Sequence, residues 1–325
     1  MNQPLVTVFM AAYNGERYIR QALDSALAQT YPRMEVIVVN DGSTDSTPRI
    51  LAEYGDRIRW FTQPNAGQAS ARNLAVSHAR GEWVAMLDQD DLWDPSKIER
   101  QVVAIRTGDA VIHCNARIID ASGQIVLAAM RRADVEAYAT IVDLFITKLP
   151  SAPTVLIRKE SYISVGGFDP ANRFGTEDYQ LWLRLAAHGY RFRFVDEVLA
   201  SYRVHGNNMS GNFRRQILGV FYAIRRTRRE YPGAFGPAER RACHRRLNQA
   251  EFALAWHLYD HDEYGQAWYH FCLAVWHRPS DWRAWAHAAM TSLPLRSHLV
   301  PLVRAAVTGR GSTLPKARAR KGGSG

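Results

Sequence analysis

Cysteine is scarce in this chain, and its few cysteines form no pattern. Only three of the 325 residues are cysteines, at positions 114, 243 and 272. Their odd number and wide spacing fit neither a zinc site nor a framework of disulfide bonds. We therefore expect a cytoplasmic protein, because thiols stay reduced in that compartment.

Long apolar runs and two phosphate-binding patterns are also absent. No stretch of about 20 uncharged apolar residues occurs, so no membrane-spanning helix is predicted. The chain begins almost directly with a β-rich run at residues 5–10, without the regions of a signal peptide. Neither a G-x-G-x-x-G sequence after this run nor a Walker A sequence is present. This disfavours a dinucleotide-dependent dehydrogenase, and any phosphate must be held through metal and side chains.

Positive charge is concentrated in the last third of the chain. The net charge is +10, and residues 213–325 contain 19 Lys and Arg but 7 Asp and Glu. Within residues 213–226 an apolar stripe alternates with arginines. This pattern suits a helix on an anionic membrane, or one that packs its stripe on the rest of the protein. Docking through basic C-terminal helices on the inner face of the membrane is therefore one expectation, and nucleic acid is not an expected partner.

The first hundred residues alternate between predicted strands and helices. Apolar, β-rich runs lie at residues 5–10, 34–39, 58–61 and 83–87. Helical patterns separate them, with Asn14 as the expected cap of the first helix and Pro48 in the first turn of the second. This order predicts a mostly parallel sheet with right-handed crossovers.

The rest of the chain is less regular and then becomes helical. Residues 110–119 read as a strand, residues 179–187 as a helix, and residues 191–195 as an extended segment. From residue 213 onward the pattern is helical throughout. We expect a catalytic domain at residues 1–212, a helical region at residues 213–307 and a disordered basic tail at residues 308–325.

Acidic residues follow two of the predicted strands. Asp88-Gln89-Asp90 comes directly after residues 83–87, and Asp41 follows the strand at residues 34–39. Open α/β sheets bind ligands at this edge, and crowded carboxylates repel one another unless a cation lies among them. A hard divalent ion that carries a phosphate is the natural occupant. Asp41 suits either a nucleoside contact or a turn before Gly42, and Tyr13 suits either base stacking or packing.

An ordered set of motifs resembles family 2 glycosyltransferases. The set consists of residues 11–14 (AAYN), 39–45 (VNDGSTD), 65–73 (NAGQASARN), 87–91 (LDQDD), 166–169 (GGFD), 176–182 (TEDYQLW) and 202–205 (YRVH). The resemblance covers residues 4–210 in unbroken order. It implies an inverting enzyme with a GT-A fold, which is a Rossmann-like, mostly parallel mixed sheet flanked by helices, here followed by a helical C-terminal region.

The resemblance also implies roles for residues that would contact the nucleotide sugar. Tyr13 and Asp41 would contact the nucleoside, and Ala11 and Gln89 would line the same site. Arg72 would lie near the base or the phosphate; the alternative is a solvated charge on a helix. These residues, together with Asp88, which would face the ribose and the donor sugar, form the expected donor site.

The metal and the catalytic base follow from the same resemblance. Asp90 would bind Mn²⁺ or Mg²⁺, and His205 would approach this metal or the diphosphate; an ordinary loop histidine is the alternative. Asp178 would be the catalytic base, although Glu177-Asp178 could equally be the acidic first turn of a helix. An alcohol is a weak nucleophile, so a positioned carboxylate must take its proton.

These expectations combine into one function with two alternatives. We expect a hexosyltransferase that moves a sugar from a nucleotide-diphospho sugar, most simply a UDP-sugar, to a glycan or lipid-linked acceptor of surface polysaccharide. A nucleotidyltransferase acting on sugar phosphates would use similar acids on a related sheet. A non-catalytic module that binds nucleotide sugars is the third reading.

Overall fold

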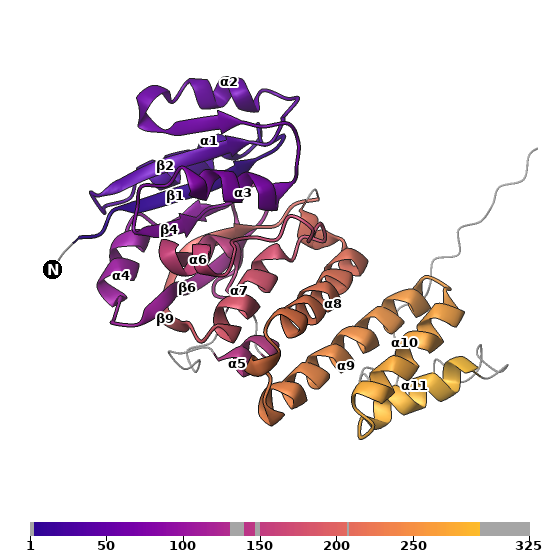
Figure 1. The fold of residues 1–325 in the computed structure, drawn as a ribbon. Coiled ribbons are helices and arrows are strands. Elements are labelled where there is room, and N and C mark those ends of the chain that lie inside the picture. Colours follow the sequence, from indigo (N-terminus) through magenta and orange to yellow (C-terminus); the bar gives the residue numbers. More distant parts are fainter. Residues whose placement is uncertain (1–2, 131–139, 147–149, 207, 293–325) are drawn as a thin grey trace, which may run out of the picture. The chain divides into compact units, whose positions relative to one another are not determined.

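A computed structural model describes residues 3–130, 140–146, 150–206 and 208–292 (Figure 1). The chain forms two compact units, and the second begins at Glu251. The predicted tail at residues 308–325 lies outside the described residues. The domain boundary between residues 212 and 213 stays a prediction, and the helix that begins at Phe213 belongs to the first unit.

A single mixed sheet organises the first unit. In the described part of the chain it has nine strands in the order β3-β2-β1-β4-β8-β6-β9-β5, with β7 paired to β6. The first four strands run parallel, whereas β8 is antiparallel to both of its neighbours. The strands are β1 Val6–Ala12, β2 Met34–Asn40, β3 Arg59–Thr62, β4 Trp83–Met86, β5 Leu92–Trp93, β6 Asp109–Ile119, β7 Ile125–Leu127, β8 Val155–Arg158 and β9 Arg191–Arg203.

Helices flank this sheet and bury its apolar residues (Figure 1). α1 shows the principle, because Ile19, Leu23 and Ala26 recur at helical spacing and are fully buried. The predicted α/β architecture is therefore confirmed. The α-helices that begin in the first unit are α1 Ile19–Leu27, α2 Thr47–Ala52, α3 Gln68–Ser77, α4 Lys97–Ala104, α5 Ile141–Ile146, α6 Lys159–Ser164, α7 Glu177–Ala187, α8 Phe213–Glu230 and α9 Pro237–Asp260. The last of these, α9, continues into the second unit.

The prediction that Asn14 caps the first helix is wrong. α1 begins at Ile19 with Tyr18 as its N-cap. Asn14 instead has a left-handed backbone with φ of 48°, and its side chain accepts a hydrogen bond from the backbone N–H of Thr44 (2.8 Å). A contact to a loop 30 residues away therefore uses the oxygen that a cap would need.

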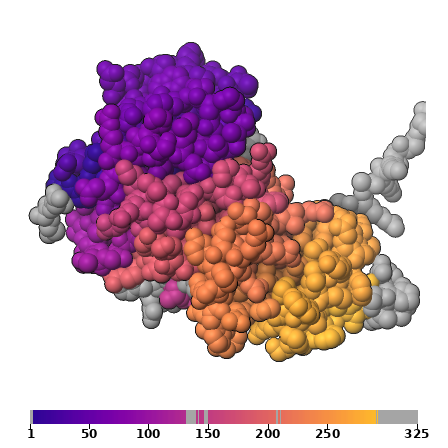
Figure 2. All heavy atoms as spheres, in the orientation of Figure 1, coloured from indigo at the N-terminus to yellow at the C-terminus, as the bar shows by residue number. Residues whose placement is uncertain are grey.

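The apolar stripe of α8 is buried inside the first unit. Ile217, Val220, Phe221 and Ile224 are buried, and α8 packs against α7. Of the two expectations for this helix, the structure shows the second, in which the apolar stripe packs on the rest of the protein. The residues of the first unit form one closely packed mass in Figure 2.

The second unit is built from helices. It contains the end of α9, followed by α10 Tyr264–His277 and α11 Trp282–Ser292. Phe252 is partly buried and packs against its core, and its ring lies 5.5 Å from that of Phe271 and 5.3 Å from that of His287. Among the described residues of both units, no helix is long and apolar enough to cross a membrane.

Candidate active site

Asp41 is buried at the carboxyl end of β2 and holds the loop before α3. Its carboxylate accepts hydrogen bonds from the backbone N–H groups of Ala66 and Gly67 (both 2.9 Å) and from the amide of Gln63 (2.7 Å). Its own N–H donates to Ala12 in the neighbouring strand. A carboxylate can accept about four hydrogen bonds, and among the described residues this one accepts three.

Tyr13 and Gln89 form the adjoining part of this edge. The side-chain amide of Gln89 accepts from the backbone N–H of Tyr13 (2.9 Å) and donates to its carbonyl (3.0 Å). Tyr13 is 47% exposed, and base stacking requires an accessible ring. Ala11 lies in β1 opposite Val39 and is partly buried. The carboxyl ends of β1, β2 and β4 therefore meet, as the positions of these residues in the sequence predicted.

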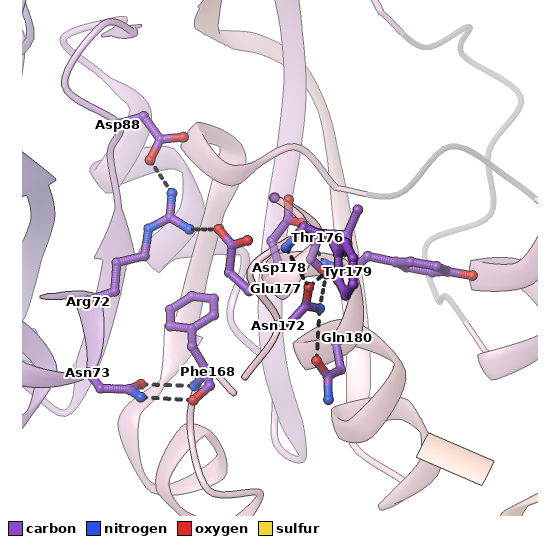
Figure 3. A network of polar contacts seen from close by, with 12 residues as sticks. Arg72, Asn73, Asp88, Phe168, Asn172, Thr176, Glu177, Asp178, Tyr179 and Gln180 are labelled. Atoms are coloured by element: carbon purple, nitrogen blue, oxygen red, sulfur yellow. Dashed lines mark hydrogen bonds and ion pairs between the residues drawn. The ribbon is translucent and has the colours of Figure 1, made fainter. Parts of the chain in front are cut away.

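Arg72 joins two carboxylates that are far apart in the sequence. It lies on α3 and is only 1% exposed. One of its terminal nitrogens donates to Glu177 (2.6 Å) and the other to Asp88, and its guanidinium lies 5.3 Å from the centre of the Phe168 ring (Figure 3). Burial alone would lower the pKa of Arg72, but the charges of Asp88 and Glu177 outweigh it and raise that pKa. The alternative of a solvated helix charge is therefore excluded.

Asp178 is the second residue of α7 and lies directly beside this ion-pair network. Its carboxylate accepts a hydrogen bond from the backbone N–H of Tyr179 (2.7 Å) (Figure 3). Burial, followed by the negative charge of Glu177, raises the pKa of Asp178 to about 7. A helix N-terminus would lower the pKa, so burial dominates here. At neutral pH such a carboxylate can accept a proton.

Asp90 and His205 meet at the same edge. The Nε2 atom of His205 lies 2.9 Å from Oδ2 of Asp90, and the imidazole packs against the Tyr18 ring at 5.0 Å. Burial and then the charge of Asp88 raise the pKa of Asp90. A cation would relieve this repulsion.

Two protein ligands suit one class of metal site. In the described part of the chain, no group of three or more His, Cys, Asp or Glu residues is arranged to hold a metal. Mg²⁺ in nucleotide sites takes few protein ligands and completes its shell with phosphate oxygens and water. The carboxylate of Asp90 is a ligand of this kind, and the imidazole of His205 lies 2.9 Å from it, but the two do not make an all-protein cage.

Asp91 and Arg203 were missed by the sequence analysis. Asp91 is buried and accepts a hydrogen bond from the backbone N–H of Arg203 (2.8 Å), whose Nε donates to the carbonyl of Asp90 (2.8 Å). These bonds fix the end of β9 against the acidic segment and thereby place His205 beside Asp90. Both residues stand in the motifs, but their pairing joins positions 112 residues apart, and no sequence pattern reports it.

A cavity of about 240 Å³ lies beside the Arg72–Glu177 pair. The start of α3, the segment before α7 and the start of α8 line it. Its polar lining includes Asn65, Gln68, Arg173, Glu177 and Arg215. A small polar molecule fits this space next to Glu177.

The comparisons with known proteins identify the family. The sequence profile of "Glycosyl transferase family 2" matches residues 7–166. An uncharacterised glycosyltransferase of Rickettsia typhi is 36% identical over 219 residues, which are 66% of this chain and 68% of the relative. This chain belongs to glycosyltransferase family 2. A putative teichuronic acid biosynthesis glycosyltransferase, TuaG of Bacillus subtilis, is 30% identical over 70% of this family 2 chain and 90% of the relative.

Solved structures show which fold this family 2 glycosyltransferase has. Mannosyltransferase PcManGT from Pyrobaculum calidifontis, in complex with GDP-Man and Mn²⁺, superposes with a TM-score of 0.62 at 22% identity, over 94% of this chain and 81% of that one. S. aureus TarS 1–349, in complex with UDP-GlcNAc, gives a TM-score of 0.63 at 19% identity, over 94% and 87% of the two chains. The expected GT-A fold is confirmed.

Proposed function

We propose that this glycosyltransferase is a metal-dependent, inverting enzyme that transfers a sugar from a UDP-sugar to a hydroxyl of a glycan or lipid-linked acceptor in surface polysaccharide synthesis. The observation that carries the proposal is the buried Arg72 bridge. It fixes Asp88, at the donor end of the sheet, to Glu177, the neighbour of Asp178. A candidate donor contact and a candidate base are thereby held in one rigid network.

The donor site follows from the carboxyl edge of the sheet. The exposed Tyr13 ring can stack on a base, and the remaining acceptor position of Asp41 can take a hydrogen bond from it. Asp88, oriented by Arg72, faces the ribose and the sugar in this proposal. A divalent cation held by Asp90 and His205 would supply Lewis-acid stabilisation of the diphosphate leaving group.

Asp178 performs the proton transfer in this proposal. Its raised pKa lies near neutral pH, so its ionised form can accept the proton of the acceptor hydroxyl. The hydroxyl oxygen then bonds to the anomeric carbon while the bond to the diphosphate breaks on the opposite face. A single displacement inverts the anomeric centre and needs no nucleophile from the protein.

Surface polysaccharide is the acceptor class that the relatives favour. TuaG is named for teichuronic acid biosynthesis, and a chondroitin synthase of Pasteurella multocida is 29% identical over 64% of this chain, which spans 21% of that relative. UDP is preferred because TarS was solved with UDP-GlcNAc, although PcManGT was solved with GDP-Man. A thermal-shift panel of UDP- and GDP-sugars with Mn²⁺ and Mg²⁺ separates these donors.

Two substitutions test the proposal. Asp178→Asn should retain UDP-sugar affinity but lose about 10²–10⁴-fold in the rate of sugar transfer, since the general base is gone. The exposed Asp196→Asn is the matched control. Asp90→Ala should abolish the gain in UDP affinity that Mn²⁺ provides in calorimetry. Full turnover by Asp178→Asn would remove Asp178 from the base role, and an undiminished Mn²⁺ effect in Asp90→Ala would remove Asp90 from the metal site.

A further inference from the structure

The cavity beside the Arg72–Glu177 pair carries positive charge that the protein leaves uncompensated. Arg173 and Arg215 line it, and Glu177 is the only acidic residue of its lining in the described part of the chain. Arg72 donates to the carboxylate of Glu177 at 2.6 Å, so that negative charge already has a partner. Neither Arg173 nor Arg215 forms an ion pair with any described residue. An anionic group is therefore complementary to this cavity.

The guanidinium of Arg173 is available to a ligand. Arg173 is exposed, and its side chain has no hydrogen-bond or ion-pair partner among the described residues. Its backbone is held in place, because the neighbouring Asn172 is buried and donates to the carbonyl of Thr176 (3.2 Å) and to the side chain of Gln180 (2.9 Å) (Figure 3). An anion that binds Arg173 therefore displaces no contact of the described fold.

Arg215 is positioned by the same segment. It lies in the first turn of α8, and its Nε (3.0 Å) and one terminal nitrogen donate to the backbone carbonyl of Arg173. The next residue, Gln216, donates to the carbonyl of Gly175 (3.1 Å). A guanidinium has five N–H groups, and these two bonds are the ones that Arg215 makes through its side chain to described residues. The remaining N–H groups can bind a ligand in the cavity that both arginines line.

Neutral hydrogen-bonding groups line another part of the cavity. The side-chain amides of Asn65 and Gln68, at the start of α3, have no hydrogen-bond partner among the described residues. An amide both donates and accepts, as does a sugar hydroxyl. Amides beside two arginines suit a sugar unit that carries an acid group better than they suit a small inorganic anion, which has no hydroxyls to offer.

We propose that this cavity binds the acceptor glycan through an acid group, with Arg173 and Arg215 as the residues that select it. The acid group is the carboxylate of an acidic sugar or a phosphodiester, since the planar fork of an arginine matches both. This inference rests on the proposed function, in which Asp178, the second residue of α7, takes the proton of the acceptor hydroxyl. Glu177, the first residue of that helix, lines the cavity, so an acceptor bound there lies at the turn that carries the base.

The diphosphate of the donor is a less suitable occupant of this cavity. In the proposed function the diphosphate binds at the cation held by Asp90 and His205, and neither of these residues lines the cavity. Asp88, which is proposed to face the donor sugar, does not line it either. Two arginines around the acceptor would also offset the negative charge that an acidic glycan brings towards Asp178.

Titrations of the full-length protein followed by the NMR signals of the ligand test the inference. The probes are methyl β-D-glucuronide, glycerophosphoglycerol and the neutral methyl β-D-glucoside, each with UDP and Mn²⁺ present so that the donor site is filled. At least one of the two anions should bind about tenfold or more tightly than the glucoside, and the tighter one identifies the acid group. Arg173→Gln and Arg215→Gln should each weaken its binding about tenfold or more, and leave glucoside binding unchanged.

Matched variants control for folding and for general charge effects. Arg229→Gln removes another exposed arginine, from the last turn of α8, and should leave anion binding unchanged. Arg173→Gln removes no contact of the described fold, so its thermal unfolding should match that of the wild type. Arg173→Lys keeps the charge and should restore part of the affinity. Calorimetry should give Arg173→Gln the same affinity for UDP with Mn²⁺ as the wild type.

Three outcomes would overturn the inference. One is equal binding of the three probes, and another is undiminished anion binding by Arg173→Gln. The third is a loss of UDP affinity in Arg173→Gln, which would assign this arginine to the donor. Failure of the proposed function looks different: the wild type would not bind UDP with Mn²⁺, but with UDP omitted it would still bind the anion through Arg173.

Discussion

Replacing Arg72 with methionine tests the central electrostatic feature of the site. The substitution keeps an unbranched side chain but removes the guanidinium, which leaves Glu177 and Asp88 without their cation. The side chains of Arg72 and Glu177 are 2% and 5% exposed, so water does not compensate the charge that remains. Breaking a buried ion pair by removing one partner costs about 3–5 kcal/mol. We expect a loss of that size in the free energy of unfolding.

The chain supplies a matched control for this measurement. Arg20 also donates to a glutamate at 2.6 Å, namely Glu53, but the two side chains are 50% and 43% exposed. Arg20→Met should therefore cost at most about 1 kcal/mol. Urea denaturation of both variants, followed by far-UV circular dichroism, compares a buried with an exposed pair at the same distance.

A double substitution shows where the energy loss originates. In Arg72→Met with Glu177→Gln, the uncompensated carboxylate is gone, so part of the lost stability should return. A loss in Arg72→Met no larger than that in Arg20→Met would refute the reasoning. A double variant less stable than Arg72→Met alone would show that packing, and not charge, explains the loss.

The remaining predictions concern Asp178 and the contact between α8 and α7. Because only the ionised Asp178 accepts a proton, the transfer rate should rise with pH through about 7; a profile that stays flat from about pH 5.5 to 8.5 would contradict this. Because folding raises the pKa of Asp178, the native state loses stability as the pH rises from the pKa of this residue in the unfolded chain towards 7. Asp178→Asn should therefore melt no lower than wild type at about pH 8. Gly219→Ala places a Cβ 2.2 Å from Oγ1 of Thr176 and should destabilise by about 1–3 kcal/mol in thermal unfolding, whereas Gly265→Ala has open space and should not.

The strands of the first half were predictable from local pattern alone. Val36, Val38 and their neighbours form a continuous apolar run, and such a run is buried on both faces of a parallel sheet. Register and order were not predictable. The antiparallel insertion of β8 between β4 and β6 depends on contacts between segments about 70 and 45 residues apart, which no local pattern encodes.

The candidate site also has a part that was predictable from the sequence and a part that was not. Asp41, Asp88 and Asp90 follow strands directly, and the ends of neighbouring parallel strands must meet, so their proximity was predictable. The contacts that hold these acids in place were not predictable. Arg72 and Glu177 are 105 residues apart, and Asp41 is held by backbone N–H groups, which every residue but proline possesses. Sequence indicates which charges exist, whereas the fold decides which of them are paired.

The pairing gives the three acids after β4 different electrostatic positions. Asp88 faces the Arg72 guanidinium, and Asp91 accepts a backbone N–H in the presence of the Arg203 charge. Asp90 faces an imidazole, which can bind a metal in its neutral form. Burial and the charge of Asp88 raise the pKa of Asp90, and among the described residues its carboxylate, unlike that of Asp88, forms no ion pair with an arginine, so a cation gains more at Asp90. This is the physical reason for our proposal that Asp90 binds the metal and Asp88 contacts the sugar, although both belong to the same three-residue motif.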